Sequence, residues 1–490
     1  MTTRFFGREL ELKELQDRIK KNGSSFFAVK GRRRIGKSTL LRNAMESCVD
    51  GFYFFGIQGE SNASLLRRFA AQWGKFSGSP LAKLAPRFLQ WQEVVDDIKS
   101  HVASHKLVIV LDEIQWIHTL KNGFNGYLKD LWESTKGTRN IKIIISGSSR
   151  RYFAEHVENQ NSTLYGLKTH GAIIVPPFSL DEVRRFYFPK WNVEQAALVY
   201  MMVGGIPYYL ENVAYGDNFM RAVEQTFFVK SSLFLEEARE ILSTEYRRRP
   251  MIDKVMLTLS ALARGIVSEE NLCKSIKVSQ PNMNQILAFL LDLGFIHRTA
   301  ECDESGRWSD KRYILNDFFL RFYFLVIEKN RARINASEDS VFYNYVIESA
   351  DGYYIRNFSG VAFEALLRAH IVRNELFCPS TKPAKLFDRL EIKASHDYTV
   401  REFRRASEAQ IDLVISDKTD RELRFIEVKW LSRDLTAKEL AQNLDKTRTR
   451  AESYVKHLGD TSYARSFFVA VNRTRLVGHD QVIRLADLIE

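Results

Sequence analysis

Cysteine is scarce in this chain of 490 residues. The four cysteines are Cys48, Cys273, Cys302 and Cys378. They lie far apart and form no C-x-x-C pair, which argues against a disulfide framework and against a thiolate zinc site. This use of cysteine is typical of a protein that works in a reducing compartment.

Long apolar segments and internal repeats are also missing. The first residues, MTTRFFGRELELKEL, are charged almost from the start and lack the apolar core of a signal peptide. Asn316, Asp317 and Arg321 interrupt the most aromatic run, YILNDFFLRFYFLVI, so this run is no credible membrane span. We therefore expect a cytoplasmic protein with no membrane partner.

Apolar and basic residues are abundant. Hydrophobic residues make up 45% of the chain and aromatic residues 12%, which excludes a disordered, fibrous or collagen-like protein. Lys and Arg number 72 against 60 Asp and Glu, a formal net charge of +12. Such a balance favours a polyanionic partner.

The first half of the chain has the pattern of an α/β fold. RELELKELQDRIKKN has helical spacing, and three apolar runs of strand length follow: SSFFAVKG, KLVIVLDEI (106–114) and IKIIISGSS (141–149). Buried strands that alternate with helices predict a parallel sheet. After PPFSLDEVRRF the pattern is almost wholly helical, which predicts a helical lid over residues 181–245.

The second half predicts two more regions. Helix-like SEENLCKSI and SQPNMNQILAFLLDLG, followed by two strand-like runs in FIHRTAECDESGRWSDKRYIL, predict a winged helix over 246–330. We expect the polar segment 331–350 to be a connector. Helical GVAFEALLRAHIV and strand-like IDLVISD and LRFIEVKW then predict a C-terminal α/β domain over 351–490.

A phosphate-binding loop lies between the strand AVK and the helix STLLRNAM. The segment GRRRIGKS fits G-x-x-x-x-G-K-[ST] at every fixed position and has the required strand and helix on its two sides. Lys37 is expected to bridge the β- and γ-phosphates, and Ser38 to ligate magnesium. The residues expected to line ATP here are Gly31, Arg32, Arg33, Arg34, Ile35, Gly36, Lys37, Ser38 and Thr39.

Acidic and hydroxyl side chains end the next two apolar runs. Asp112 and Glu113 lie where ligands of parallel α/β sheets bind, so we expect Asp112 to hold magnesium and Glu113 to activate water. Ser146 ends the third run and is a candidate sensor of the γ-phosphate, although small polar residues also end strands routinely. Arg150 and Arg151, like the loop arginines, are either phosphate contacts or a solvated basic surface.

FFGRELELKEL, GRRRIGKSTLL, LVIVLDEIQWI, IIISGSS and GGIPYYL occur in this order. Together they resemble the STAND-class prokaryotic ATPases of the AAA+ superfamily, especially the archaeal-type group. The resemblance implies a P-loop ATPase core over 1–180. It also implies that Arg8 lies by the nucleotide base and that Pro207, in the lid, lies near the nucleotide.

The predicted recognition helix of the winged helix has two open interpretations. Gln280, Asn282, Asn284 and Gln285 are able to pair with base edges in a major groove, and Lys311, Arg312 and Arg247 to Arg249 are able to contact phosphates. The alternative, by resemblance to STAND-like ATPases, is an intramolecular clamp that reports the nucleotide state.

The C-terminal domain carries acids followed by Glu-x-Lys. Alternation along a strand puts Glu427 and Lys429 on one face, and Asp412 on the neighbouring strand is able to share a cation with them. The two carboxylates would hold Mg²⁺ or Mn²⁺, and Lys429 would position water or stabilise the oxyanion. Glu364, on a preceding helix, is the fourth candidate catalytic residue.

This arrangement resembles the PD-(D/E)xK nuclease fold. Its pairing with an upstream ATPase, and the segments YILNDFFLRFYF and GVAFEALL, resemble proteins with a conserved C-terminal domain of unknown function. In that resemblance Glu364 fits the helix acid, although Glu391 is an alternative, and Gln442 is a further candidate. Gln410 and Ile411 stand where a more acidic approach to the Asp is common.

We therefore expect an ATP-hydrolysing switch that controls a metal-dependent nuclease acting on nucleic acid, with DNA favoured over RNA. The alternative is a regulatory ATPase that binds DNA or a protein and whose nuclease-like domain cuts nothing. A metabolic kinase is disfavoured, because a lid and winged helix follow the loop rather than an acceptor-substrate domain. Assembly into a homo-oligomer is left open.

Overall fold

The chain forms two compact units, Met1–Pro176 and Pro177–Glu490. The computed structural model describes residues 7–46, 48, 50–83, 90–118, 122–138, 140–245, 251–265, 267–302, 308–336, 353–372, 379, 382–393, 395–405, 409–458 and 462–489. None of the helices in this described part combines the length and the apolar character needed to cross a membrane.

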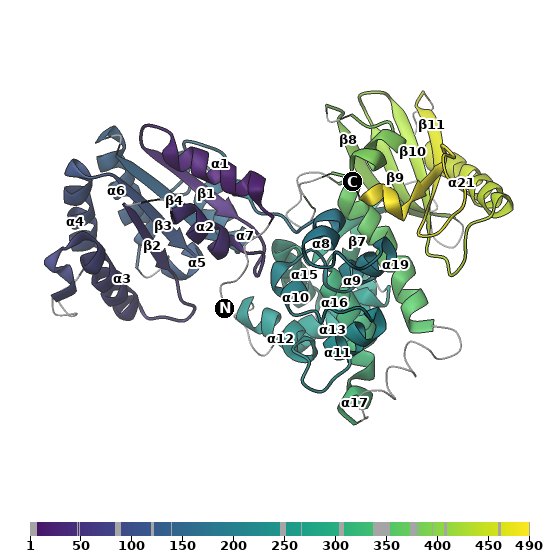
Figure 1. Cartoon of the computed structure of the whole chain (residues 1–490), viewed down its shortest axis with the longest axis horizontal. Helices are drawn as coiled ribbons and strands as arrows, with labels where there is room; N and C mark the ends of the chain where they lie inside the picture. Colours follow the sequence, from purple (N-terminus) through teal and green to yellow (C-terminus); the bar gives the residue numbers. More distant parts are fainter. Residues whose placement is uncertain are drawn as a thin grey trace. The chain divides into compact units, whose positions relative to one another are not determined.

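The first unit contains a five-stranded parallel sheet in the order β2-β3-β4-β1-β5 (Figure 1). Its strands are β1 (Ser25–Lys30), β2 (Gly51–Phe55), β3 (Leu107–Asp112), β4 (Ile141–Gly147) and β5 (Ile173–Ile174). The three apolar runs predicted as strands are β1, β3 and β4. Strand β2 was not predicted, although its residues GFYFF form an apolar run of strand length, and β5 was not predicted because two residues form no pattern.

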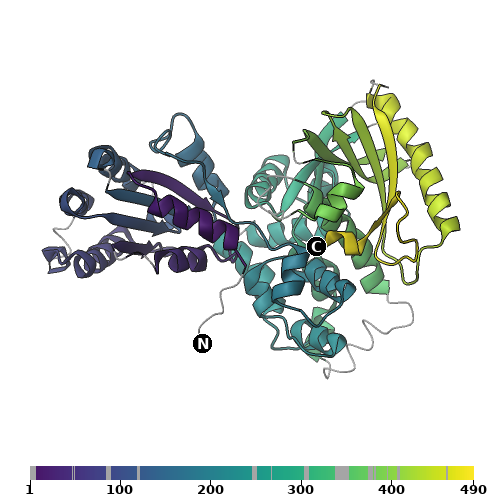
Figure 2. The ribbon, with the colours of Figure 1, turned by 45° about the horizontal axis from the view of Figure 1, so that its top comes forward.

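Helices cover both faces of this sheet (Figures 1 and 2). They are α1 (Glu9–Lys20), α2 (Lys37–Met45), α3 (Asn62–Ser77), α4 (Trp91–Ser104), α5 (Ile114–Ile117), α6 (Phe124–Thr135) and α7 (Arg150–Phe153). Phe26 and Ala28 of β1 share a core with α3, α4 and α6. The intervening Phe27 has the guanidinium of Arg18 of α1 at 5.4 Å from its ring centroid, as alternation along a strand requires.

The second unit begins with helices and a hairpin. The elements are α8 (Leu180–Phe186), α9 (Val193–Val203), α10 (Pro207–Glu211), α11 (Phe219–Phe227), α12 (Phe234–Glu245), α13 (Ile252–Ala263), α14 (Glu269–Ile276), α15 (Gln280–Leu293), β6 (Ile296–Cys302) and β7 (Trp308–Leu315). The antiparallel hairpin pairs Ile296 with Leu315. The helices and two strands predicted here are thus present. The basic residues 247–249 and the hairpin tip lie outside the described residues.

In the part of the chain that the structure describes, the hairpin is followed by helices α16 (Phe318–Phe322), α17 (Glu328–Ala336) and α19 (Tyr353–Ile371). Helix α17 occupies the first part of the segment expected to be a connector, and the rest of that segment lies outside the described residues. The described part of the expected connector is therefore helical.

The C-terminal sheet is mixed, with five strands in the order β12-β11-β10-β9-β8. Its elements are α20 (Ala384–Arg389), β8 (Tyr398–Arg405), β9 (Ala409–Asp417), β10 (Glu422–Lys429), α21 (Ala437–Leu458), β11 (Ala464–Val471) and β12 (Val482–Arg484). Strand β10 runs antiparallel to β9 and parallel to β11. Tyr454 and Val455 of α21 pack on Leu423 and Phe425 of β10, so α21 covers one face of this sheet.

Candidate functional sites

The loop between β1 and α2 has a backbone that depends on glycine. Gly36 has a φ of +89°, in the left-handed region that glycine adopts without strain, and directly precedes the first turn of α2. At Gly31, a Cβ atom would come within 2.7 Å of the carbonyl oxygen of Val175. The loop therefore folds tightly against the end of the sheet and directs the first amides of α2 into its own concavity.

Lys37 and Ser38, two of the residues predicted to bind the nucleotide, both contact the end of β3 or the residue after it. The side chain of Lys37 is only 3% exposed, and its Nζ donates to the carbonyl of Arg32 at 3.0 Å and lies 4.0 Å from Oε1 of Glu113. The hydroxyl of Ser38 donates to Oδ2 of the fully buried Asp112 at 2.6 Å. The structure thus brings the lysine and hydroxyl of the loop to both acids.

Tyr53 of β2, which was not predicted as a site residue, also contacts Asp112. Its Oη donates to Oδ2 of Asp112 at 2.5 Å, and the backbone amide of Glu113 donates to Oδ1 at 3.0 Å. Burial, followed by the charge of Asp112, raises the pKa of the Tyr53 phenol above its usual value. Tyr53 therefore stays a protonated donor at neutral pH.

Glu113 adopts a left-handed backbone conformation, with a φ of +51°, where β3 turns into α5. Its Oε2 accepts hydrogen bonds from Nε2 of Gln115 and, at 3.3 Å, from the hydroxyl of Ser148. Ser148 rather than Ser146 thus contacts this acid. The Oγ of Ser146 is buried and has no hydrogen-bond partner among the described residues.

The other predicted nucleotide residues are placed as follows. Arg8 precedes α1, and its Nη2 donates to the carbonyl of Ile35 at 3.5 Å, so Arg8 lies beside the loop. Arg32, Arg33 and Arg34 are half-buried, Ile35 is a core side chain, and Thr39 is exposed. Pro207 is the first residue of α10 and belongs to the second compact unit.

The donor set at this loop fits ATP with magnesium. A buried lysine and the first turn of a helix suit a triphosphate. A hydroxyl hydrogen-bonded to a buried carboxylate supplies the hard oxygen atoms that magnesium prefers.

In the second unit, Asp412 and Glu427 lie on neighbouring strands. The antiparallel register ends where Ile426 pairs with Leu413, so Glu427 directly follows the last paired residue of β10 and Asp412 directly precedes its partner on β9. Both acids are buried, and Oδ2 of Asp412 accepts from the backbone amide of Val428 at 2.7 Å. The two acids therefore lie at the same end of neighbouring strands.

Two cations contact Glu427. Lys429 donates from Nζ to Oε1 at 2.6 Å, and Arg450 of α21 contacts Oε2 at 3.2 Å. Arg450 was not predicted, because only tertiary packing brings α21 onto the strand. Gln442, the candidate on the same helix, is exposed.

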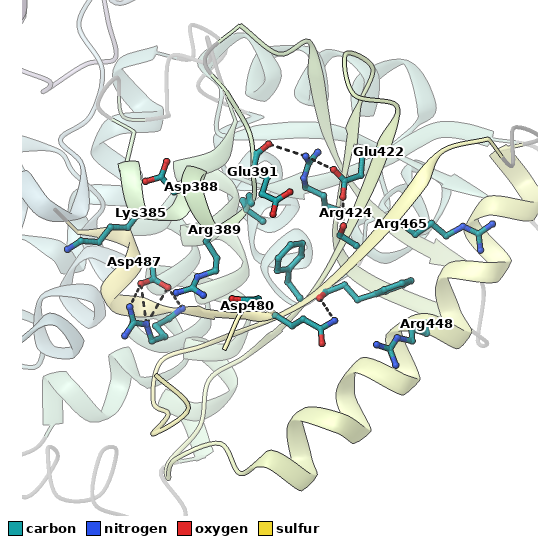
Figure 3. A pocket seen from close by; sticks show the side chains of 16 residues that line it. Lys385, Asp388, Arg389, Glu391, Glu422, Arg424, Arg448, Arg465, Asp480 and Asp487 are labelled. Carbon is teal, nitrogen blue, oxygen red and sulfur yellow. Dashed lines mark hydrogen bonds and ion pairs between the residues drawn. The ribbon is translucent and has the colours of Figure 1, made fainter. Parts of the chain in front are cut away.

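The sequence offers two candidates for the helix acid, Glu364 and Glu391. Glu364 is half-buried on α19, which lies against β9 and β10, and the neighbouring Phe363 packs on the ring of Trp430 at 5.3 Å. Glu391, the alternative, lines a cavity of about 760 Å³ (Figure 3). Its carbonyl accepts from Arg424 in the first half of β10, whereas Glu427 lies near the other end of that strand.

One group of three possible metal ligands occurs among the residues that the structure describes: His396, Asp417 and Asp420. It does not include Asp412, Glu427 or Glu364. Asp417 already accepts from His396 at 2.7 Å and from the buried Arg424 at 3.1 Å. The guanidinium supplies the positive charge that a metal would bring, so this group is a structural ion-pair network.

Comparisons with known proteins match two separate segments of the chain, and the first of them extends past Pro176 into the second unit. Residues 5–213 match the model of an ATPase domain found predominantly in Archaea, and residues 323–442 match a family of archaeal and bacterial proteins of unknown function. The uncharacterized protein MJECL04 of Methanocaldococcus jannaschii is 27% identical over 451 residues, which cover 90% of this chain and 91% of that protein.

A solved structure is similar to most of the chain. The Walker-type ATPase PABY2304 of Pyrococcus abyssi has a TM-score of 0.51 at 20% identity and covers 66% of this chain and 96% of its own. Cdc6p of Pyrobaculum aerophilum has a TM-score of 0.35 at 14% identity, covering 68% of this chain and 95% of its own. Residues 5–213 are therefore similar to an archaeal-type ATPase domain, and residues 323–442 are similar to a family of unknown function.

Proposed function

We propose that the chain is an ATP-hydrolysing switch whose nucleotide state controls a metal-dependent nuclease-like domain acting on nucleic acid, preferentially DNA. The observation that carries the ATPase part is the 2.6 Å hydrogen bond between Ser38 of the loop and the buried Asp112. It supports the assignment because these two groups are the ones that hold magnesium in P-loop enzymes.

The residues suggest how hydrolysis proceeds. The amides of α2 and the ammonium of Lys37 bind the phosphates. Ser38 and Asp112 would hold magnesium, which would neutralise charge on the phosphate oxygens. Glu113 accepts the proton of the attacking water. Because Gln115 and Ser148 hold one oxygen of Glu113, they fix the direction in which this carboxylate faces.

Replacing Lys37 with alanine tests the ATPase assignment. Loss of a charge-assisted contact to the phosphates is expected to weaken ATP binding roughly 10- to 100-fold, and hydrolysis should fall with it. Binding of a fluorescent ATP analogue measures the loss, and Lys129→Ala, on the exposed face of α6, is the control. Equal affinity in the two variants would contradict the assignment.

The second unit contains a direct connection between its helical part and the end of β10. Glu194, in the first turn of α9, accepts from Nε of Arg473 at 2.8 and 2.9 Å and from Nδ2 of Asn472 at 3.1 Å. The amide of Leu431 donates to Oδ1 of Asn472 at 2.6 Å. Since Leu431 follows Lys429 by two positions, a shift of α9 would be transmitted to the proposed nuclease residues.

A buried histidine forms a second connection. Nε2 of His370, on α19, accepts from the backbone amide of Leu180 at the start of α8 at 3.1 Å. Burial lowers the pKa of His370 to about 4, so the ring is neutral and remains an acceptor near pH 7. These two connections support control of the C-terminal domain by the helices that we propose as the lid.

Replacing Glu194 with glutamine is expected to weaken this control. Without the charge, the amide of Leu431 should exchange hydrogen roughly three- to tenfold faster, and the difference in its exchange between ATP-bound and ATP-free protein should shrink. Hydrogen exchange measures both quantities. Asp217→Asn removes the exposed ion pair with Lys190 in the same helical region and is the control. An unchanged ATP effect in Glu194→Gln would exclude this connection as the route.

We propose that α13 to α15 and the hairpin form a winged helix that acts mainly as a clamp. Strand β6 of the hairpin lies alongside β8 of the C-terminal sheet, so the hairpin has an intramolecular partner. The side chains of Asn282 and Asn284 on α15 are exposed, so they are also able to contact DNA. A clamp and a DNA reader differ in whether changing these two residues alters DNA affinity.

One observation favours a second candidate function for the C-terminal domain. Both Lys429 and Arg450 neutralise Glu427, and two cations on one carboxylate are able to replace a metal ion. A domain of this kind would bind nucleic acid or a protein partner without cutting. Metal-dependent cleavage distinguishes the two candidates.

A further inference from the structure

Tyr53 is fixed on two sides between α2 and β3. Its hydroxyl donates to Oδ2 of Asp112 at 2.5 Å, and the guanidinium of Arg42, on α2, lies 5.1 Å from its ring centroid. Neither partner is adjacent to Tyr53 in the sequence, so tertiary structure alone holds it there. A phenol packed in this way retains little freedom to rotate.

Three donors converge on the carboxylate of Asp112. Ser38 and Tyr53 share Oδ2, and the amide of Glu113 takes Oδ1. A carboxylate has about four lone-pair directions, so these bonds fix its plane and its rotation. Ser38 by itself cannot do this, because a hydroxyl rotates and the loop that carries it is the element that meets the nucleotide.

We propose that Tyr53 is a positioning residue for the magnesium-binding carboxylate, holding Asp112 aligned with the hydroxyl of Ser38 before the nucleotide enters. The inference rests on the proposed role of Asp112 in binding magnesium. Tyr53 itself touches neither metal nor phosphate in this account. Its loss therefore weakens the response to magnesium and leaves metal-free nucleotide binding intact.

The test is the dependence of ATP hydrolysis on free Mg²⁺ at saturating ATP, compared between wild type and Tyr53→Phe. Loss of one hydrogen bond to a charged group is expected to raise the half-activating Mg²⁺ concentration roughly tenfold. Binding of an ATP analogue in EDTA should stay at the wild-type affinity. Together these two measurements separate a defect in metal positioning from a general defect of the fold.

Tyr152→Phe is the matched control. Tyr152 is buried in the same unit and donates a single hydrogen bond, to Oδ1 of Asn125 at 2.8 Å, so the substitution removes an equivalent hydroxyl. The magnesium curve should move in Tyr53→Phe alone. An unchanged curve in Tyr53→Phe, or an equal shift in both variants, would overturn the proposal.

Asp112→Asn separates this proposal from the function on which it rests. If Asp112→Asn hydrolyses ATP with the wild-type magnesium dependence, the assignment of the metal site is wrong. If Asp112→Asn loses the magnesium response and Tyr53→Phe keeps it, only the role of Tyr53 is wrong.

Discussion

Replacing Glu113 with glutamine is expected to slow ATP hydrolysis at least about 100-fold, the lower limit for loss of a general base. Glutamine has nearly the same size and still accepts through its carbonyl oxygen, so the contact with Ser148 is retained. Lys37 and Ser38 are untouched, and binding of magnesium-ATP should stay within about threefold of wild type. The variant is thus expected to hold ATP without hydrolysing it.

Single-turnover hydrolysis and equilibrium binding of an ATP analogue measure these two effects separately. Glu155→Gln is the control, since Glu155 lies at the surface of the same unit and pairs with Arg151. A Glu113→Gln variant that hydrolyses ATP at more than about a tenth of the wild-type rate would exclude Glu113 as the general base.

Replacing Asp412 with asparagine is expected to abolish metal-dependent cleavage by the C-terminal domain. Loss of a metal ligand should reduce the rate at least about 100-fold, because loss of a group that merely supports a ligand already costs about 10- to 100-fold. Asparagine is still able to accept from the backbone amide of Val428, so the end of the sheet should remain folded. The variant therefore separates chemistry from stability.

Cleavage of plasmid, linear and single-stranded DNA and of RNA, with Mg²⁺ or Mn²⁺, measures this effect. Asp434→Asn is the control, because Asp434 is a surface acid of the same domain that pairs with the exposed Arg475. Equal cleavage by both variants would exclude Asp412 as a metal ligand of the proposed nuclease site. If wild type and variants all bind nucleic acid and none cuts it, the C-terminal domain is the binding module of the second candidate function.

The nucleotide site could be predicted from the sequence to the extent that its chemistry is local. The loop, its lysine and its serine occupy a fixed spacing, and strand ends of a parallel sheet meet at one edge, which brings Asp112 to Ser38. Tyr53 was missed because nothing near it in the sequence indicates that β2 lies beside β3. Gln115 was missed although it stands two positions after Glu113, because the hydrogen bond depends on the unusual backbone of Glu113.

In the C-terminal domain, too, local features could be predicted from the sequence and contacts made by tertiary packing could not. Alternation along β10 correctly predicted that Glu427 and Lys429 share a face, and they form an ion pair at 2.6 Å. The contact of Arg450 with Glu427 could not be predicted, since it depends on how α21 packs across the sheet. That contact matters for function, because it favours the candidate without cleavage.

The most direct measurement is nucleic-acid cleavage by the purified full chain with Mg²⁺ or Mn²⁺, with and without ATP, beside Lys37→Ala and Lys429→Ala. We expect cleavage that responds to ATP in the wild type, disappears in Lys429→Ala, and no longer responds to ATP in Lys37→Ala. A wild-type protein that hydrolyses ATP and cuts no substrate under any of these conditions would contradict the proposed control of a nuclease by ATP.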